Sequence, residues 1–114
     1  MLDRTLEQLE GAEWDEPDYG SSVVTNCHRL RRVPLRDFTV EDLRLTIGQR
    51  MGLEHLVPLA LEQLERDPMV SGDYYEGDLL QNVQRLPAKF WEQHPALRER
   101  WHSVQVAVAA LPPA

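Results

Sequence analysis

Apolar residues recur every three or four positions along most of the chain, which is the spacing of amphipathic α-helices. Their start and stop signals predict six or seven short helices. The first five cover residues 5–10, about 21–31, 39–52, 54–67 and 79–86, a brief helix follows Pro87, and a last one runs from Pro95 to Pro112. No run alternates apolar and polar residues as a strand does. The sequence therefore predicts an all-α fold, with a single compact domain over residues 1–114 and helices in an irregular, orthogonal-type array.

Two of the predicted helix starts have the spacing of a capping box. In this motif a Ser or Thr side chain and a residue three positions later each accept the other's backbone N–H. The pairs are Thr5 with Gln8 and Thr39 with Asp42. We expect Gly52 to end the helix that Thr39 begins, because glycine readily takes the left-handed backbone conformation that closes a helix.

The helix predicted over residues 54–67 is apolar on more than one side, so we expect it to lie at the centre of the fold. Pro58 should lie near its first turn, where a missing N–H matters least. Gly48, inside the preceding helix, costs about 1 kcal/mol relative to alanine and indicates close approach of a neighbouring helix. The core is predicted to include Leu56, Leu59, Leu61, Leu64 and Trp101. The second helix is predicted to bury a stripe of Val23, Val24, Cys27 and Leu30.

The chain is acidic, with 19 acids, 12 bases and a net charge of −7. Residues 1–18 carry seven acids and one base, residues 19–36 carry four arginines and no acid, and residues 54–80 again carry seven acids and one base. This excess disfavours general binding to nucleic acid or anionic lipid and favours a basic partner. Two interpretations stay open, because the alternating stretches can also be solvated faces that compensate one another.

The sequence carries no pattern of catalysis, metal binding or cofactor binding. Its four histidines stand in no zinc-ligand spacing, and no glycine-rich phosphate loop is present. Cys27 is the only cysteine and lies on an apolar stripe, so we expect a core thiol and a reducing, cytoplasmic location. We expect neither an export signal nor a membrane span. The arginine run 29–32 is only a weak candidate for nucleic-acid binding within an acidic chain.

The strongest candidate for partner binding is the polar segment GDYYEGD. Paired tyrosines supply large, stiff contact area, and flanking acids suit a cationic partner. The candidate contact residues are Asp73, Tyr74, Tyr75, Glu76 and Asp78, together with the acids of an N-terminal loop, Glu13, Asp15, Glu16 and Asp18. As an alternative, one tyrosine is buried beneath the loop and Asp78 merely caps the next helix.

Several stretches resemble the helical immunity proteins of contact-dependent growth inhibition (CDI) systems. They are TLEQLEG with Trp14 and Pro17, then CHRLRRVPLRDFTVEDLR, IGQRMGLEHLVPLALEQLERDP, and GDYYEGDLL followed by FW. They run in order through nearly the whole chain. One departure is Glu76, where the family often has a proline, so this loop is expected to be more acidic and more mobile than usual.

The resemblance implies a cytosolic protein that binds the C-terminal toxin domain delivered by a neighbouring cell and blocks it. Such toxins are often nucleases or membrane-active domains, and the acid excess agrees with a basic nuclease. The resemblance implies no enzyme activity and no cofactor, and we expect a monomer before toxin binding. The alternatives are a helical adaptor that binds a different basic protein, or a small hydrolase or nuclease that uses acids and histidines.

Overall fold

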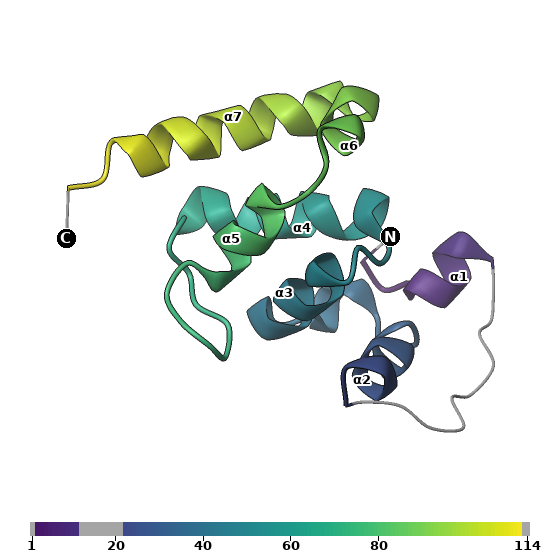
Figure 1. Ribbon diagram of the computed structural model, residues 1–114. Coiled ribbons are helices and arrows are strands. Elements are labelled where there is room, and N and C mark those ends of the chain that lie inside the picture. Colours follow the sequence, from purple (N-terminus) through teal and green to yellow (C-terminus); the bar gives the residue numbers. More distant parts are fainter. Residues whose placement is uncertain (1, 12–21, 113–114) are drawn as a thin grey trace.

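The computed structural model describes residues 2–11 and 22–112 of the chain (Figure 1). This part forms seven α-helices and one 3-10 helix. They are α1 (Leu6–Glu10), α2 (Ser22–Leu30), η1 (Leu35–Asp37), α3 (Val40–Gly48), α4 (Leu53–Arg66), α5 (Asp78–Gln84), α6 (Ala88–Gln93) and α7 (Pro95–Ala109). The described residues form no strand, only a single antiparallel bridge between Ser71 and Glu76. The predicted all-α fold is confirmed.

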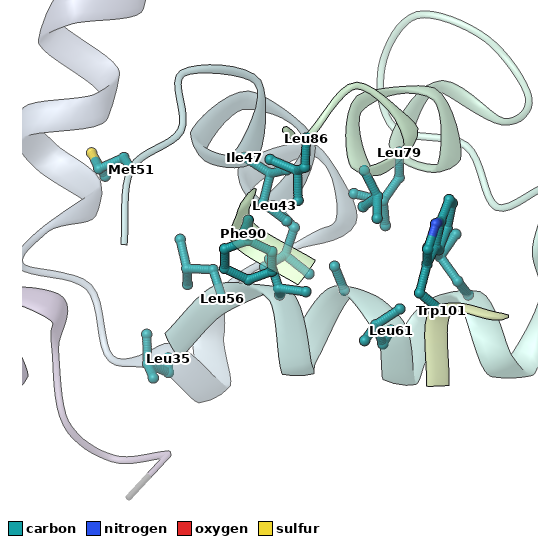
Figure 2. Close-up of a cluster of buried hydrophobic side chains, with 14 of the residues drawn as sticks. Leu35, Leu43, Ile47, Met51, Leu56, Leu61, Leu79, Leu86, Phe90 and Trp101 are labelled. Carbon is teal, nitrogen blue, oxygen red and sulfur yellow. The ribbon is translucent and has the colours of Figure 1, made fainter. Parts of the chain in front are cut away.

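Helix α4 is the centre of the fold. It packs against α3 and α5 on one side and against α7 on the other (Figure 1). Its fully buried residues are Leu56, Val57, Ala60, Leu61 and Leu64. Figure 2 shows side chains of α3, α5 and α6 gathered over the face of α4 that carries Leu56 and Leu61. The central position predicted for this helix is confirmed, with Leu59 only partly buried at the edge of the core.

Both predicted capping boxes are present. The hydroxyl of Thr5 accepts the N–H of Gln8 at 3.1 Å, and that of Thr39 accepts the N–H of Asp42 at 3.1 Å, each with the reciprocal bond at 3.0 Å. Gly11, which directly follows the helix predicted over residues 5–10, ends α1 with φ of +66°. These three helix ends therefore form where the local pattern places them.

The role predicted for Gly52 is wrong. Helix α3 ends at Gly48, and Gly52 instead precedes α4 as its N-cap, with φ of +58°. A Cβ atom on Gly52 would lie 2.8 Å from a methyl carbon of Leu6. Glycine is required here by a tight turn and by the approach of α1.

Gly48 has the close neighbour that its position predicted. A Cβ atom there would lie 2.9 Å from Nδ2 of Asn82, which belongs to α5. Pro58 lies deeper in α4 than expected, since it is the sixth residue of a helix that starts at Leu53. Its missing N–H therefore falls in the second turn rather than the first.

In helix α2 the predicted apolar stripe is only partly buried. Cys27 and Leu30 are buried, but Val24 is 47% exposed, so including it was wrong. Burial raises the pKa of the Cys27 thiol. Residues one position apart on a helix point about 100° apart, so Val23, which packs partly on the core, and Val24 cannot both face it.

Helices α6 and α7 are joined by aromatic stacking. The rings of Trp91 and Trp101 lie nearly parallel, with centroids 5.6 Å apart. Arg100 then fastens α7 to α4 through bonds to Glu65 at 2.7 and 3.1 Å and to the carbonyl of Pro58 at 3.4 Å. The Arg100 guanidinium lowers the pKa of Glu65.

Two arginines of the basic stretch, residues 19–36, pair with the acids of α1. Arg31 is almost fully buried and forms an ion pair with Glu10, and Arg32 lies 3.3 Å from a carboxylate oxygen of Glu7. The backbone N–H of Glu7 also donates to the carbonyl of Arg31 at 3.0 Å. At these positions the alternating charge along the sequence is internal pairing.

Candidate functional site

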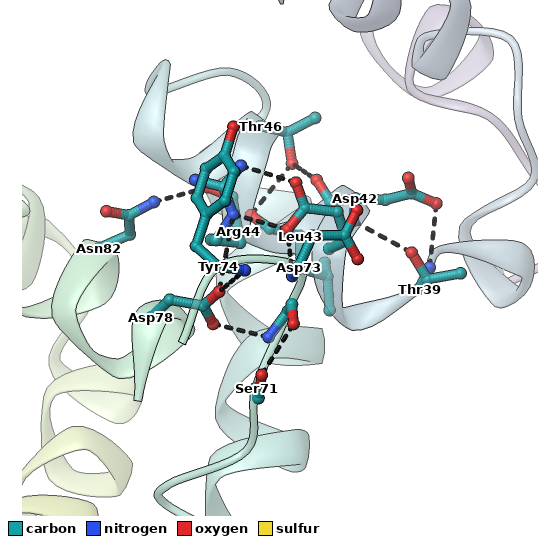
Figure 3. Close-up of polar contacts among 12 residues, drawn as sticks. Thr39, Asp42, Leu43, Arg44, Thr46, Ser71, Asp73, Tyr74, Asp78 and Asn82 are labelled. Atoms are coloured by element: carbon teal, nitrogen blue, oxygen red, sulfur yellow. Dashed lines mark hydrogen bonds and ion pairs between the residues drawn. The ribbon is translucent and has the colours of Figure 1, made fainter. Parts of the chain in front are cut away.

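The segment GDYYEG forms a surface loop between α4 and α5, and this loop packs against the first turns of α3 (Figure 3). Residues 71–77 are named here the tyrosine loop. Its ends meet at the bridge between Ser71 and Glu76, and the N–H of Gly77 donates to the carbonyl of Met69 at 3.1 Å. Gly77 has φ of +84°, a conformation that glycine takes without strain.

The carboxylate of Asp78 lies beneath the tyrosine loop and binds its backbone. It accepts the N–H groups of Gly72, Tyr74 and Tyr75 at 2.7, 3.2 and 3.4 Å. Burial raises the pKa of Asp78, but the backbone N–H bonds outweigh burial and hold it below its ordinary value. The role of helix cap expected as the alternative is wrong, because Gly77 is the N-cap of α5 and Asp78 is its first residue.

A second carboxylate, Glu41 of α3, holds the remaining N–H of this turn. Its Oε1 accepts the N–H of Asp73 at 2.9 Å. Four consecutive N–H groups, residues 72–75, therefore donate to two side-chain carboxylates. A Cβ atom on Gly72 would lie 2.7 Å from Oε1 of Glu41, so a side chain there would displace this carboxylate.

Arg44 of α3 balances the charge of both carboxylates. Its Nε and Nη2 each donate to Glu41 at 2.6 Å, and its Nε lies 3.9 Å from Asp78. The Arg44 ion pair, together with the Asp73 N–H, lowers the pKa of Glu41 against the effect of burial. The guanidinium carbon also lies 4.1 Å from the centroid of the Tyr74 ring, a cation–π contact.

The tyrosine loop brings four of the predicted contact residues together at the surface. Tyr74 and Tyr75 are 71% and 51% exposed, and Asp73 and Glu76 are exposed as well. Neither tyrosine is buried, so the alternative of a tyrosine beneath the loop is wrong. Asp78 is 2% exposed and has almost no surface to offer a partner.

The other four predicted contact residues, Glu13, Asp15, Glu16 and Asp18, lie outside the described residues. Their part in a binding surface stays a prediction.

Glu41 and Arg44 are site residues that the sequence did not reveal. Their spacing of three positions is that of an ordinary surface ion pair on a helix, and the capping box of Asp42 explained the neighbouring acid. Nothing local indicated that a loop 32 residues away would dock there. Their contacts with the loop become visible only in the fold, where α3 packs against α5.

Within residues 2–11 and 22–112, no three His, Cys, Asp or Glu side chains gather in a way that could hold a metal ion. Over the same residues no helix is both long and apolar enough to cross a membrane.

Tyr74 and Tyr75 are exposed, and tyrosine is a residue type enriched at protein–protein contacts, so the geometry suits a protein-binding surface. The comparison with known families then specifies the family. The sequence model of the family described as CDI immunity proteins matches residues 8–101. The chain belongs to this family. No curated protein sequence matches the chain.

Proposed function

We propose that this protein binds the C-terminal toxin domain of a contact-dependent growth inhibition effector and neutralises it by that binding, without catalysing a reaction. Family membership supports a cognate toxin as the partner. The observation that carries the choice of surface is the tyrosine loop, where Tyr74 and Tyr75 are exposed on a backbone held by two carboxylates. Tyrosines presented in this way lose little conformational entropy on binding.

The charge of the protein supports a basic toxin domain, such as a nuclease. Asp73 and Glu76 flank the two tyrosines at the surface, and the whole chain carries a net charge of −7. An acidic surface attracts a basic enzyme and can occupy the place of its polyanionic substrate. The proposal also places the protein in the cytoplasm, where a delivered toxin would act, as a monomer that meets one toxin domain.

The test uses the purified cognate toxin domain, first in co-purification and then in stopped-flow binding. The association rate should fall steeply with salt, because attraction between exposed charges is screened beyond about 8 Å at physiological ionic strength. The dissociation rate should change much less. Replacing Asp73 and Glu76 together by lysine should slow association at low salt.

A matched control reverses two exposed acids on the opposite side of the molecule. Glu92 of α6 and Glu99 of α7 are both exposed, and α6 lies far from the tyrosine loop (Figure 1). The change in net charge is the same as in the Asp73 and Glu76 double variant. A larger effect at the loop than at the control pair identifies the loop as the contact surface.

Tyr74→Ala should act differently from the charge reversals, since it removes contact area rather than long-range attraction. We expect it mainly to speed dissociation, by on the order of 2 kcal/mol for a hot-spot tyrosine. Salt-independent association together with full protection by the loop variants would place the interface elsewhere. The arginine-bearing segment 29–36 would then be the next surface to test.

A further inference from the structure

Arg44 has a position that pairing with Glu41 alone does not explain. Its side chain is 12% exposed and pairs with Glu41. The same guanidinium lies 3.9 Å from the carboxylate of Asp78 and over the ring of Tyr74 (Figure 3). We propose that Arg44 is a positioning residue for toxin binding, which holds the Tyr74 ring in the orientation that meets the partner. This inference rests on the proposed function of the tyrosine loop.

The contacts of Arg44 leave one face of the Tyr74 ring covered and the rest open. The guanidinium carbon is 4.1 Å from the ring centroid, yet the tyrosine remains 71% exposed. The backbone N–H of Tyr74 is bound by Asp78 at 3.2 Å. The backbone of this residue and its side chain are thus held by separate contacts, and Arg44 supplies the contact to the side chain.

The chemistry of this position requires arginine rather than any cation. The planar guanidinium donates two bonds to Glu41, both at 2.6 Å, while its carbon lies over the aromatic ring, 4.1 Å from the centroid. A lysine ammonium is a compact charge without a planar face, so it cannot make the paired bonds and stack at once. The carbonyl of Arg44 also accepts Nδ2 of Asn82 at 2.8 Å, which ties this turn of α3 to α5.

Without the guanidinium, Tyr74 would sample several side-chain rotamers in the free protein. Only a fraction of molecules would then present the ring correctly, and the apparent affinity would fall in proportion to that fraction. The expected loss is roughly three- to tenfold, which is the range of one cation–π contact at a partly exposed site. Part of this loss of affinity should appear as a slower association rate, because in fewer encounters is the ring already in the binding orientation.

The test is a double-mutant cycle on the full chain, with the purified cognate toxin domain as the probe. Arg44→Gln, Tyr74→Ala and the double variant are compared for toxin affinity and, in parallel, for urea unfolding. If Arg44 acts through Tyr74, Arg44→Gln should weaken binding roughly three- to tenfold in the native background and not at all beside Tyr74→Ala. A role in the fold alone would weaken binding equally in both backgrounds, and that result would overturn the proposal.

Two further variants separate positioning from charge. Arg44→Lys keeps the charge but should lose most of the effect of arginine on affinity. Arg66→Gln removes an equal charge from an exposed pair with Glu62 on α4 and should leave the affinity almost unchanged. An Arg44→Lys variant that binds like the native protein would also overturn the proposal, because charge alone would then suffice.

Failure of this inference can be distinguished from failure of the proposed function. If the toxin binds but neither Tyr74→Ala nor Arg44→Gln changes affinity, the immunity function stands and the positioning role is overturned. If the native protein does not bind the toxin, both proposals fail together. A toxin-free measurement keeps the geometry testable: the NMR signals of the Arg44 side chain should show the ring-current shift of Tyr74 and lose it in Tyr74→Leu.

Discussion

Replacing Asp78 by asparagine tests whether the buried carboxylate holds the tyrosine loop in place. The substitution keeps the size of the side chain but removes its charge and turns one acceptor into a donor. If the amide oxygen faces the N–H of Gly72, now bound at 2.7 Å, the amide NH2 faces the N–H groups of Tyr74 and Tyr75. The N–H donors of Tyr74 and Tyr75 then face the NH2 donor of the amide, so the loop must open or take up water.

The cost can be worked out from the individual contacts. A hydrogen bond to a charged acceptor contributes about 1.5–3 kcal/mol, but the two that Tyr74 and Tyr75 donate are long, at 3.2 and 3.4 Å. Their loss should cost about 2–3 kcal/mol together. Loss of the attraction between Asp78 and Arg44, 3.9 Å apart, should add up to about 1 kcal/mol. We therefore expect Asp78→Asn to lower the free energy of unfolding by about 2–4 kcal/mol.

Urea titration followed by the fluorescence of the buried tryptophans measures this loss, and amide hydrogen exchange reports on residues 72–75 directly. Asp67→Asn is the matched control, because Asp67 makes one exposed bond to the N–H of Met69 at 3.0 Å and should cost less than about 1 kcal/mol. If Asp78→Asn destabilises no more than the control and these amides keep their protection, the carboxylate does not hold the loop.

Three further predictions concern the stability of the whole fold. Leu61→Ala, at a fully buried position of α4, should cost about 2–5 kcal/mol in urea titration, and a loss below about 0.5 kcal/mol would contradict its place in the core. Gly52→Ala should cost about 2–4 kcal/mol, clearly more than Gly11→Ala, because both have positive φ but only Gly52 has a leucine methyl in the way. Folding lowers the pKa values of Glu41 and Asp78, so the unfolded chain binds these protons more tightly, and stability should fall as the pH drops below about 4. A Glu41→Gln and Asp78→Asn double variant should lose less stability over the same pH range.

The features that the sequence predicted correctly depend on residues close together along the chain. The capping box joins Thr39 and Asp42, which are only three positions apart. The buried face of α4 follows from the spacing of the leucines within that helix. Gly52 was assigned to the wrong helix end for a related reason. Glycine suits the turn on either side, and the structure shows that α3 already ends at Gly48 while α4 begins directly after Gly52.

Of the candidate site, the sequence predicted only the outer part, which is the exposed residues 73–76. Exposed tyrosines and acids such as Tyr74 and Glu76 can be proposed from composition, because these residue types suit a binding surface wherever they are exposed. The inner part consists of contacts over 32 and 38 positions, from Glu41 to Asp73 and from Arg44 to Asn82. Such contacts follow from how α3 and α5 pack, which no local pattern encodes.

The way the tyrosine loop is held separates its folding from its recognition surface. Asp78 and Glu41 bind backbone N–H groups, which every residue except proline supplies, so the side chains at positions 73–76 are free to change without loss of these bonds. The two carboxylates have no such freedom, because they are the acceptors of these bonds, and a Cβ atom on Gly72 would displace the carboxylate of Glu41, 2.7 Å away. The loop is therefore divided into a base, held through backbone bonds, and an exposed surface of side chains that these bonds do not restrict. Substitutions at the exposed positions should therefore change the choice of toxin at little cost in stability, whereas changes in the base should reduce both.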